Sequence, residues 1–241
     1  MNIKKIEVSL DNTYHMYKGK PLYSRRFKYV LKFHSPGLAP VLDESGAYHI
    51  NFSGEAAYDF RFIKTFGLYF DKAAVITDKG WGHIDIFGKL IYETYYEWVG
   101  NYQDNVSTVR DKSGHYFHID KSGKRLYTEN MLYAGDYRDG IAVVRKKNGL
   151  CTHINKNGEI IHGNYFIDLD VFHKGFARAR DSSGWFHINL EGESLYNKRF
   201  SMVESFYNGL AFVEDLDMNK IIINENGDVV HKICNINQFV K

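Results

Sequence analysis

The sequence lacks several features that would place it in a specialised class of protein. It has three prolines and two cysteines among 241 residues, and no Ser-rich, Gly-rich or singly charged run interrupts it. Because 44% of its residues are hydrophobic, such a chain is expected to fold rather than stay disordered. The two cysteines, Cys151 and Cys234, are too few for a disulfide framework and fit a reducing compartment.

The sequence also lacks an excess of positive or negative charge, and it lacks long apolar segments. The chain carries 31 basic and 29 acidic side chains, so no general field attracts nucleic acid or an anionic membrane. The amino terminus has no apolar stretch of signal-peptide length, and no segment approaches the length that spans a bilayer. We therefore expect a cytoplasmic protein with no membrane partner and no general nucleic-acid binding. The oligomeric state stays open.

A motif that recurs every 34 or 35 residues dominates the sequence. The first six copies have a histidine followed by an apolar residue, and the seventh has isoleucine in the histidine position. The seven positions are His15, His49, His83, His118, His153, His187 and Ile222. Self-similarity at a fixed period is the mark of a stacked repeat protein. It predicts a single β domain over residues 1–241, without an internal linker.

Turns and strands within each repeat follow the pattern of a short antiparallel meander. Every histidine segment ends in a glycine after a polar turn, and in most copies a second glycine turn precedes the histidine. Runs such as residues 176–180 alternate in the way that half-buried strands do. We predict an all-β fold, a seven-fold array of about 34-residue antiparallel β-meander repeats. A β-propeller is the first choice and an open β-solenoid the alternative.

The two ends of the chain favour the propeller. Residues near Ile6 resemble the start of a unit, and the last copy stops after His231, so both ends could complete one terminal unit. An open solenoid would need polar caps instead.

Parity along the strands predicts which side chains face the core. Alternate residues of a strand point to opposite sides, so a small residue shares its face with the residue two positions on. Small side chains there would let neighbouring sheets approach closely. The small positions are Ala39, Ala74, Ser107, Ala142, Ala177 and Ala211, and the positions two residues on are Val41, Ile76, Val109, Val144, Ala179 and Val213.

The segment GWGHIDIFGKLIY, with its Trp81–Gly82 pair, resembles the WG-repeat (KWG) family of bacterial β-rich repeat proteins. The resemblance extends over essentially the whole chain, although Trp185 is followed by Phe186 and other copies have tyrosine, as at Tyr48. It implies a β-rich array of a kind that occurs alone or fused to enzymatic domains, including methyltransferases. The chain shows no Gly-rich cofactor loop, so a catalytic partner would lie elsewhere.

The aligned histidines are the first candidate site. An Asp or Asn follows two residues later in several copies, as in His83 and Asp85. A metal would need three or four such groups on one ion, whereas the repeat supplies one histidine per unit. We therefore predict structural hydrogen bonds within or between adjacent repeats, with no metal site and no cofactor.

An aromatic position follows each turn glycine by four residues. We predict that these rings pack in the core, and the alternative is a stacking platform for sugars or bases. The members are Tyr23, Tyr58, Tyr92, Tyr127, His162, Tyr196 and His231.

Arginines in register form the most selective pattern. Arg110, Arg145 and Arg180 are equivalent residues of successive repeats, and Arg178 lies on the same face as Arg180. Their planar guanidinium groups match phosphate or carboxylate, so we predict that this strip binds a ligand, with His173 adding positive character. The alternative is a solvated strand face that pairs with local acids such as Asp111 and Asp181, while Asp168 and Asp170 oppose the positive charge.

Catalytic motifs are otherwise absent from the sequence. It has no nucleophile elbow, metalloprotease helix, P-loop or dinucleotide fingerprint, so we expect no enzyme and assign no catalytic residue. The expected function is a non-catalytic binding or scaffolding module that recognises a protein or a small anionic ligand. The alternatives are a carbohydrate or nucleotide-sugar recognition domain and an accessory domain of a larger enzyme such as a methyltransferase.

Overall fold

The computed structural model describes residues 1–233, so Cys234 lies outside the described residues. The chain divides into two compact units, residues 1–128 and 129–241, which we call unit 1 and unit 2. That residues 1–241 form one domain stays a prediction. Within the described part, the only helical segment is a 3-10 turn at Ile3–Lys5, and no helix is long and apolar enough to cross a membrane.

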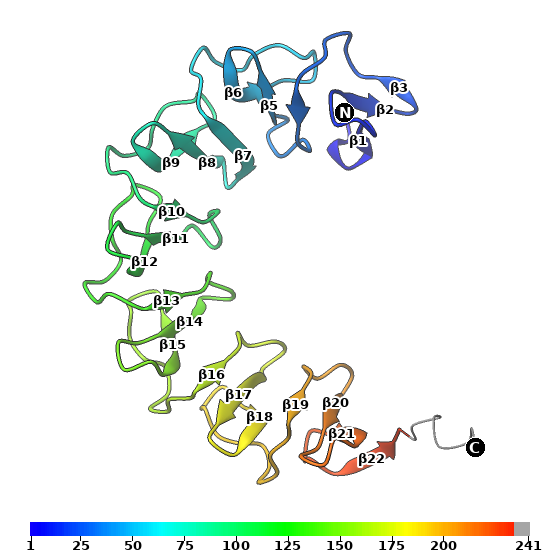
Figure 1. Ribbon diagram of the computed structural model, residues 1–241, viewed down its shortest axis with the longest axis vertical. Helices are drawn as coiled ribbons and strands as arrows, with labels where there is room; N and C mark the ends of the chain where they lie inside the picture. The colour runs from blue at the N-terminus through cyan, green and yellow to red at the C-terminus, as the bar shows by residue number, and fades with distance from the viewer. Residues whose placement is uncertain (234–241) are drawn as a thin grey trace. The chain divides into compact units, whose positions relative to one another are not determined.

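Unit 1 contains four antiparallel sheets of three strands each (Figure 1). They are β1 (Ile6–Val8), β2 (His15–Tyr17) and β3 (Lys20–Pro21); β4 (Tyr29–Val30), β5 (Ala39–Asp43) and β6 (Gly46–Ile50); β7 (Lys64–Tyr69), β8 (Lys72–Thr77) and β9 (Gly80–Asp85); and β10 (Trp98–Val99), β11 (Ser107–Arg110) and β12 (Tyr116–Ile119).

The described part of unit 2 contains two sheets of three strands and one of four. They are β13 (Tyr133–Ala134), β14 (Ile141–Arg145) and β15 (Cys151–Asn155); β16 (Asp168–Leu169), β17 (Ala177–Asp181) and β18 (Gly184–Ile188); and β19 (Met202–Val203), β20 (Leu210–Glu214), β21 (Lys220–Asn224) and β22 (Val229–Lys232). Residues 1–233 thus hold seven small meander sheets, which confirms the all-β fold and its seven units.

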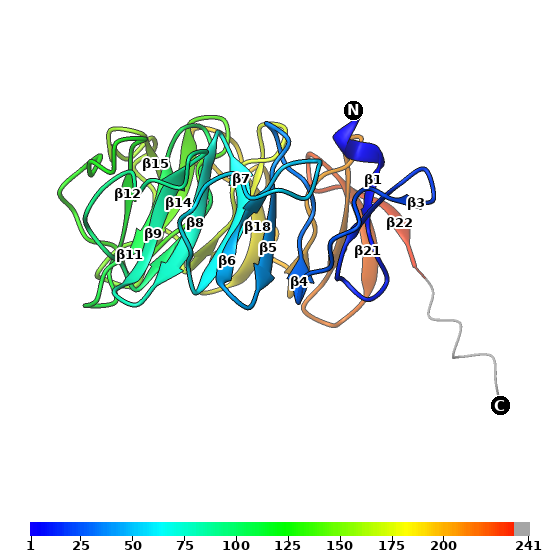
Figure 2. The same cartoon turned by 90° about the horizontal axis from the view of Figure 1, so that it is seen from above.

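Neighbouring sheets within a unit are joined by backbone pairing as well as by packing. Trp81 in β9 and Tyr96, just before β10, exchange two hydrogen bonds of 2.9 Å. In unit 2, Trp185 and Phe200 do the same at 2.8 and 3.0 Å. Figure 2 lets the reader follow β5, β8 and β11 of unit 1 as the middle strands of successive sheets.

Each terminal sheet takes all of its described strands from its own end of the chain. The first consists of β1, β2 and β3, and the last of β19 to β22. The expectation that both ends complete one terminal unit is therefore wrong for the described strands. The fourth strand of the last sheet, β22, comes from residues that follow the last turn glycine, Gly227, in the same repeat.

The core lies along the middle strand of each sheet, as the parity argument predicts. The small positions are all buried, including Ala39, Ala142 and Ala177. In the third repeat the predicted register is wrong by one residue, because Val75 pairs with Gly82 just as Val41 pairs with Tyr48 in the second. Val75 is fully buried and Ile76 is only half-buried, so Ala73 and Val75 hold the positions assigned to Ala74 and Ile76.

Candidate functional site

The repeated histidine joins each repeat to the next. In unit 1, Nδ1 of His83 lies 2.5 Å from the Tyr92 hydroxyl, and Nε2 lies 2.8 Å from the carbonyl oxygen of Gly100. Tyr92 belongs to the same repeat, whereas Gly100 follows β10 of the next sheet. Because a carbonyl can only accept, the ring carries its proton on Nε2 and accepts from tyrosine at Nδ1.

The same two bonds recur along both units. His15, His49, His153 and His187 each have Nε2 within 2.8–2.9 Å of a carbonyl oxygen of the following repeat, and those carbonyls belong to Leu31, Phe66, Asp170 and Glu204. This confirms the predicted structural hydrogen bonds within and between adjacent repeats. Burial lowers the pKa of His49, His83, His153 and His187 to about 4, so these rings are neutral at pH 7.

The aromatic position supplies the partner of the histidine and a platform for the next repeat. Tyr58 has its hydroxyl 2.5 Å from Nδ1 of His49, and a Cβ added at Gly88 of the next repeat would lie 2.5 Å from the Tyr58 ring. Gly54, Gly123, Gly192 and Gly227 approach the ring of the preceding repeat in the same way. Core packing is therefore confirmed for these rings, but His231 is exposed because β22 is the edge strand.

Arg110 in unit 1 has partners of its own. Its guanidinium lies 3.4 Å from the Glu97 carboxylate and over the ring of Tyr116. Asp111, one of the acids expected beside the strip, instead lies near His115, and in unit 2 Asp181 binds Arg199. Asp111 and Asp181 are thus not the partners of the arginines in the strip.

Two arginines of unit 2 also bind groups of the protein itself. Arg145 donates to the carbonyl oxygens of Gly149 and Ile167 and lies 3.7 Å from the Asp168 carboxylate. Arg178 forms a close ion pair with Asp170 and donates to the Val203 carbonyl at 3.0 Å. Arg178 therefore links its own repeat to the next one.

Arg180 differs from these neighbours. It is exposed, and within residues 1–233 no hydrogen bond or ion pair of its side chain is found. It pairs across the sheet with Asp168 on one side and Trp185 on the other, so Asp168 lies between Arg145 and Arg180 along the strip. Positive and negative side chains therefore alternate on this face of unit 2. Ligand binding by the arginine strip stays a prediction.

A groove in unit 2 brings together other charged groups. It has a volume of about 440 Å³ and is lined by Tyr133, Arg138, Asp170, His173 and Ser205, together with backbone and apolar side chains. Arg138 and His173 occupy equivalent tight turns of successive repeats, in which Arg138 pairs with Ile141 and His173 with Phe176. We call this the unit 2 groove, and it contains His173 of the predicted site.

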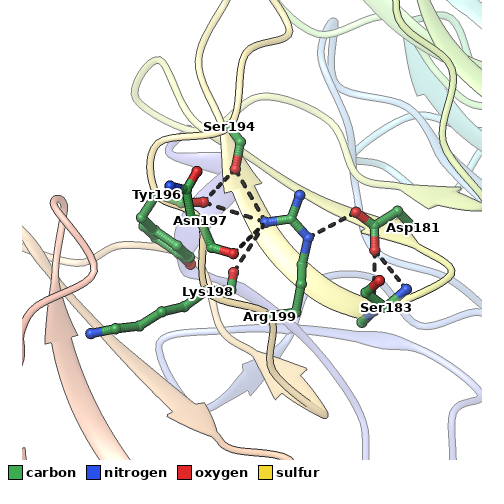
Figure 3. Close-up of polar contacts among 8 residues, drawn as sticks. Asp181, Ser183, Ser194, Tyr196, Asn197, Lys198 and Arg199 are labelled. Carbon is green, nitrogen blue, oxygen red and sulfur yellow. Dashed lines mark hydrogen bonds and ion pairs between the residues drawn. The ribbon is translucent and has the colours of Figure 1, made fainter.

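Sequence reasoning missed both Arg138 and a structural arginine, Arg199. The Arg199 guanidinium donates to Asp181 at 2.8 Å and to the carbonyl oxygens of Tyr196 and Lys198 (Figure 3). It also stacks on Phe186 at 3.6 Å. In unit 1, Arg26 and Arg61 stack on Tyr14 and Tyr48 at 3.7 and 3.8 Å. The signal was available, since each of these arginines follows a tyrosine of the aromatic position by three residues.

The comparisons with known proteins agree with this geometry. The family described as WG containing repeat matches the chain at residues 81–114 and 185–216. Two stretches of this chain thus match the WG containing repeat. Both matched stretches begin at a tryptophan that pairs with the segment leading into the next sheet, Trp81 and Trp185. Each matched stretch thus runs from the last strand of one sheet through the first two strands of the next.

One solved structure shows the fold of this chain. BamB from Moraxella catarrhalis, a β-propeller protein, is 14% identical with a TM-score of 0.50 over 97% of this chain and 86% of that chain. The likeness shows a β-propeller-like fold. AztD from Citrobacter koseri is 10% identical, with a TM-score of 0.48 over 97% of this chain and 79% of that chain. Hsv2p from Kluyveromyces lactis is 8% identical, with a TM-score of 0.47 over 93% of both chains. No curated protein matches the sequence.

Proposed function

We propose that this chain is a non-catalytic binding module and that the unit 2 groove takes an anionic ligand or an acidic segment of a partner protein. The groove carries the proposal because two positive or polarisable side chains, Arg138 and His173, line it from equivalent turns. A guanidinium binds carboxylate or phosphate oxygens with two parallel hydrogen bonds.

Asp170, the acidic residue that lines the groove, does not neutralise the side chains of Arg138 and His173. Asp170 is ion-paired with Arg178, and its carbonyl oxygen accepts from His153. A carboxylate held in this way is a poor general base, which supports a binding role rather than a catalytic one. Arg138 is exposed and keeps its guanidinium available to a ligand.

One observation favours a second candidate, recognition of a carbohydrate or nucleotide sugar. Tyr133 lines the groove and is 49% exposed, so its ring offers a face against which a sugar or base could stack. An accessory role beside an enzymatic domain would use the same groove.

The test is binding of a fluorescent hexaglutamate peptide, followed by anisotropy at about 20 mM and about 200 mM NaCl. We expect salt-sensitive binding that Arg138→Gln and His173→Gln each weaken about fivefold, close to 1 kcal/mol. Lys147→Gln removes an exposed charge outside the groove and should bind like the wild type. Equal binding by all four proteins would contradict the proposal, and displacement by neutral maltotriose would favour the second candidate.

A further inference from the structure

The turn between β20 and β21 differs from its counterparts in five other repeats, whereas the turn between β1 and β2 resembles it in having an exposed leucine, Leu10. Five repeats have polar residues at the tip of this turn and close it with glycine, at Gly46, Gly80, Gly114, Gly149 and Gly184. In the last described sheet the turn is Asp215–Leu216–Asp217–Met218–Asn219. Leu216 is 65% exposed and Met218 is 69% exposed. Two large apolar side chains are therefore exposed to solvent at a turn whose conformation does not require an apolar residue.

This turn is held in a defined conformation. The Asp215 carboxylate accepts from the backbone N–H groups of Asp217 at 2.9 Å and Asn219 at 2.8 Å, and the Met218 N–H donates to the Asp215 carbonyl at 3.0 Å. Met218 has φ of +66°, a left-handed conformation that costs a residue with a side chain roughly 1 kcal/mol. A surface fixed in advance loses little conformational entropy when a partner binds.

A hollow of about 340 Å³ lies beside the turn. Leu216 forms one wall, and Arg180, Trp185, Phe200 and Ser201 contribute to the rest. Trp185 is half-buried, packs against the core of unit 2 and also lines the hollow. The nearby acid Asp181 is bound to Arg199, which leaves it less able to neutralise Arg180.

We propose that Leu216, Met218, Trp185 and Arg180 form a docking surface for a protein segment that carries a carboxylate next to a large apolar side chain. Arg180 binds the carboxylate, since its equivalents Arg110 and Arg145 already show carboxylates at 3.4 and 3.7 Å, from Glu97 and Asp168. The apolar side chain enters the hollow between Trp185 and Leu216. Tryptophan and arginine beside an apolar rim are the residues that dominate the energy of protein interfaces.

The docking surface is separate from the unit 2 groove, and their lining residues do not overlap. A failure of the groove to bind hexaglutamate would leave this proposal standing, and the reverse also holds. The probe is a phage library of short random peptides, selected on the wild type after depletion on an Arg180→Gln/Leu216→Ser double variant.

We expect enriched peptides to share an Asp or Glu beside Leu, Phe, Ile or Met. A synthetic consensus peptide should bind the wild type, and Arg180→Gln and Leu216→Ser should each weaken binding about tenfold. Leu190→Ser, which alters an exposed apolar residue in another turn of unit 2, should leave binding unchanged. No enrichment, peptides without a carboxylate, or binding that ignores Arg180→Gln would overturn the proposal.

Met218→Gly separates binding from folding. Glycine adopts the left-handed conformation without cost, so this variant should unfold at the same temperature as the wild type or higher. It nevertheless loses an apolar contact, and its affinity for the consensus peptide should fall. Undiminished affinity would remove Met218 from the surface and contradict the proposal as stated.

Discussion

The Tyr92 hydroxyl and Nδ1 of His83 lie 2.5 Å apart, while Nε2 of the same imidazole lies 2.8 Å from the Gly100 carbonyl of the next repeat. One ring therefore bonds a side chain of its own repeat and the backbone of the following one. His83 is fully buried, so neither bond competes with water. The histidine period seen in the sequence is thus the period of contacts between sheets.

Replacing His83 with alanine should strongly destabilise unit 1. The change leaves the Tyr92 hydroxyl and the Gly100 carbonyl without their partner and opens a cavity, at a cost of roughly 2–5 kcal/mol. Urea unfolding of the variant measures this loss. His115→Ala, at a ring that is 35% exposed, is the control and should change stability by less than about 1 kcal/mol. Equal losses in both variants would mean that the His83 bonds contribute nothing of their own.

Acid should weaken the fold in a defined pH window. Burial lowers the pKa of His49, His83, His153 and His187 from 6.5 to about 4, so between these values the unfolded chain binds more protons than the folded chain. This contribution to stability is complete above pH 6.5 and is lost as the pH falls toward 4, by about 1 kcal/mol per histidine per pH unit.

Urea midpoints at about pH 7.5 and about pH 5.5 check this expectation. The pKa of Asp43 is lowered to about 2, so its contribution to stability is lost only below this pH range. It therefore does not add to the difference between the two midpoints. His187→Gln should reduce the dependence on pH. Identical midpoints at the two pH values would show that the buried imidazoles do not stay neutral.

Alanine substitutions at two glycines of unit 1 distinguish the energetic cost of a left-handed backbone from the cost of a steric clash. Gly19 and Gly88 have φ of +74° and +77°, but a Cβ at Gly19 meets nothing within 4 Å while one at Gly88 lies 2.5 Å from the Tyr58 ring. Gly19→Ala should cost about 1 kcal/mol, from the left-handed backbone alone. Gly88→Ala should cost about 1–3 kcal/mol more, because the Tyr58 ring must move. Equal costs in thermal unfolding would argue against the Tyr–Gly contact.

The fifth repeat offers a stabilising change. His162 has its Nε2 2.9 Å from Nδ1 of His153, and its own Nδ1 is buried without a hydrogen-bond partner. His162→Tyr restores the hydroxyl found at this position in other repeats and removes the unpaired nitrogen, so stability should rise by about 1 kcal/mol. The reverse change, Tyr92→His, should lower stability in unit 1. A melting temperature that falls in His162→Tyr would contradict this explanation.

Arg178 and Arg180 should respond differently to the same substitution. Arg178→Gln loses the ion pair with Asp170 and the bond to Val203, and we expect a loss of about 1 kcal/mol. Arg180→Gln removes an exposed side chain and should stay within about 0.5 kcal/mol of the wild type. Thermal unfolding of the two variants measures both changes in stability. A large loss in Arg180→Gln would reveal a structural role for that residue.

The sequence predicted the repeat unit well because its signals are local. The glycines mark turns, the alternating runs mark strands, and the period of His83 and its equivalents fixes the spacing of the sheets. It placed Ile76 wrongly because one residue of register reverses the face of a strand, and composition alone does not set that register.

The candidate site was harder to predict because its residues meet only through contacts between repeats. Arg178 looked like part of a free strip, but its ion pair with Asp170 spans a loop. Arg138 and His173 come together because their turns are equivalent, and an explicit alignment of those turns would have found them. The apolar tip at Leu216 was visible as a departure from the glycine turns of five other repeats.

Neutral, buried imidazoles with the proton on Nε2 connect successive repeats. Long-range proton–nitrogen NMR spectra of the histidine rings at about pH 6 report both charge and tautomer directly. The structure predicts that His49, His83, His153 and His187 are neutral, carry the proton on Nε2 and do not titrate near 6.5. Rings that are protonated at that pH, or that carry the proton on Nδ1, would contradict it.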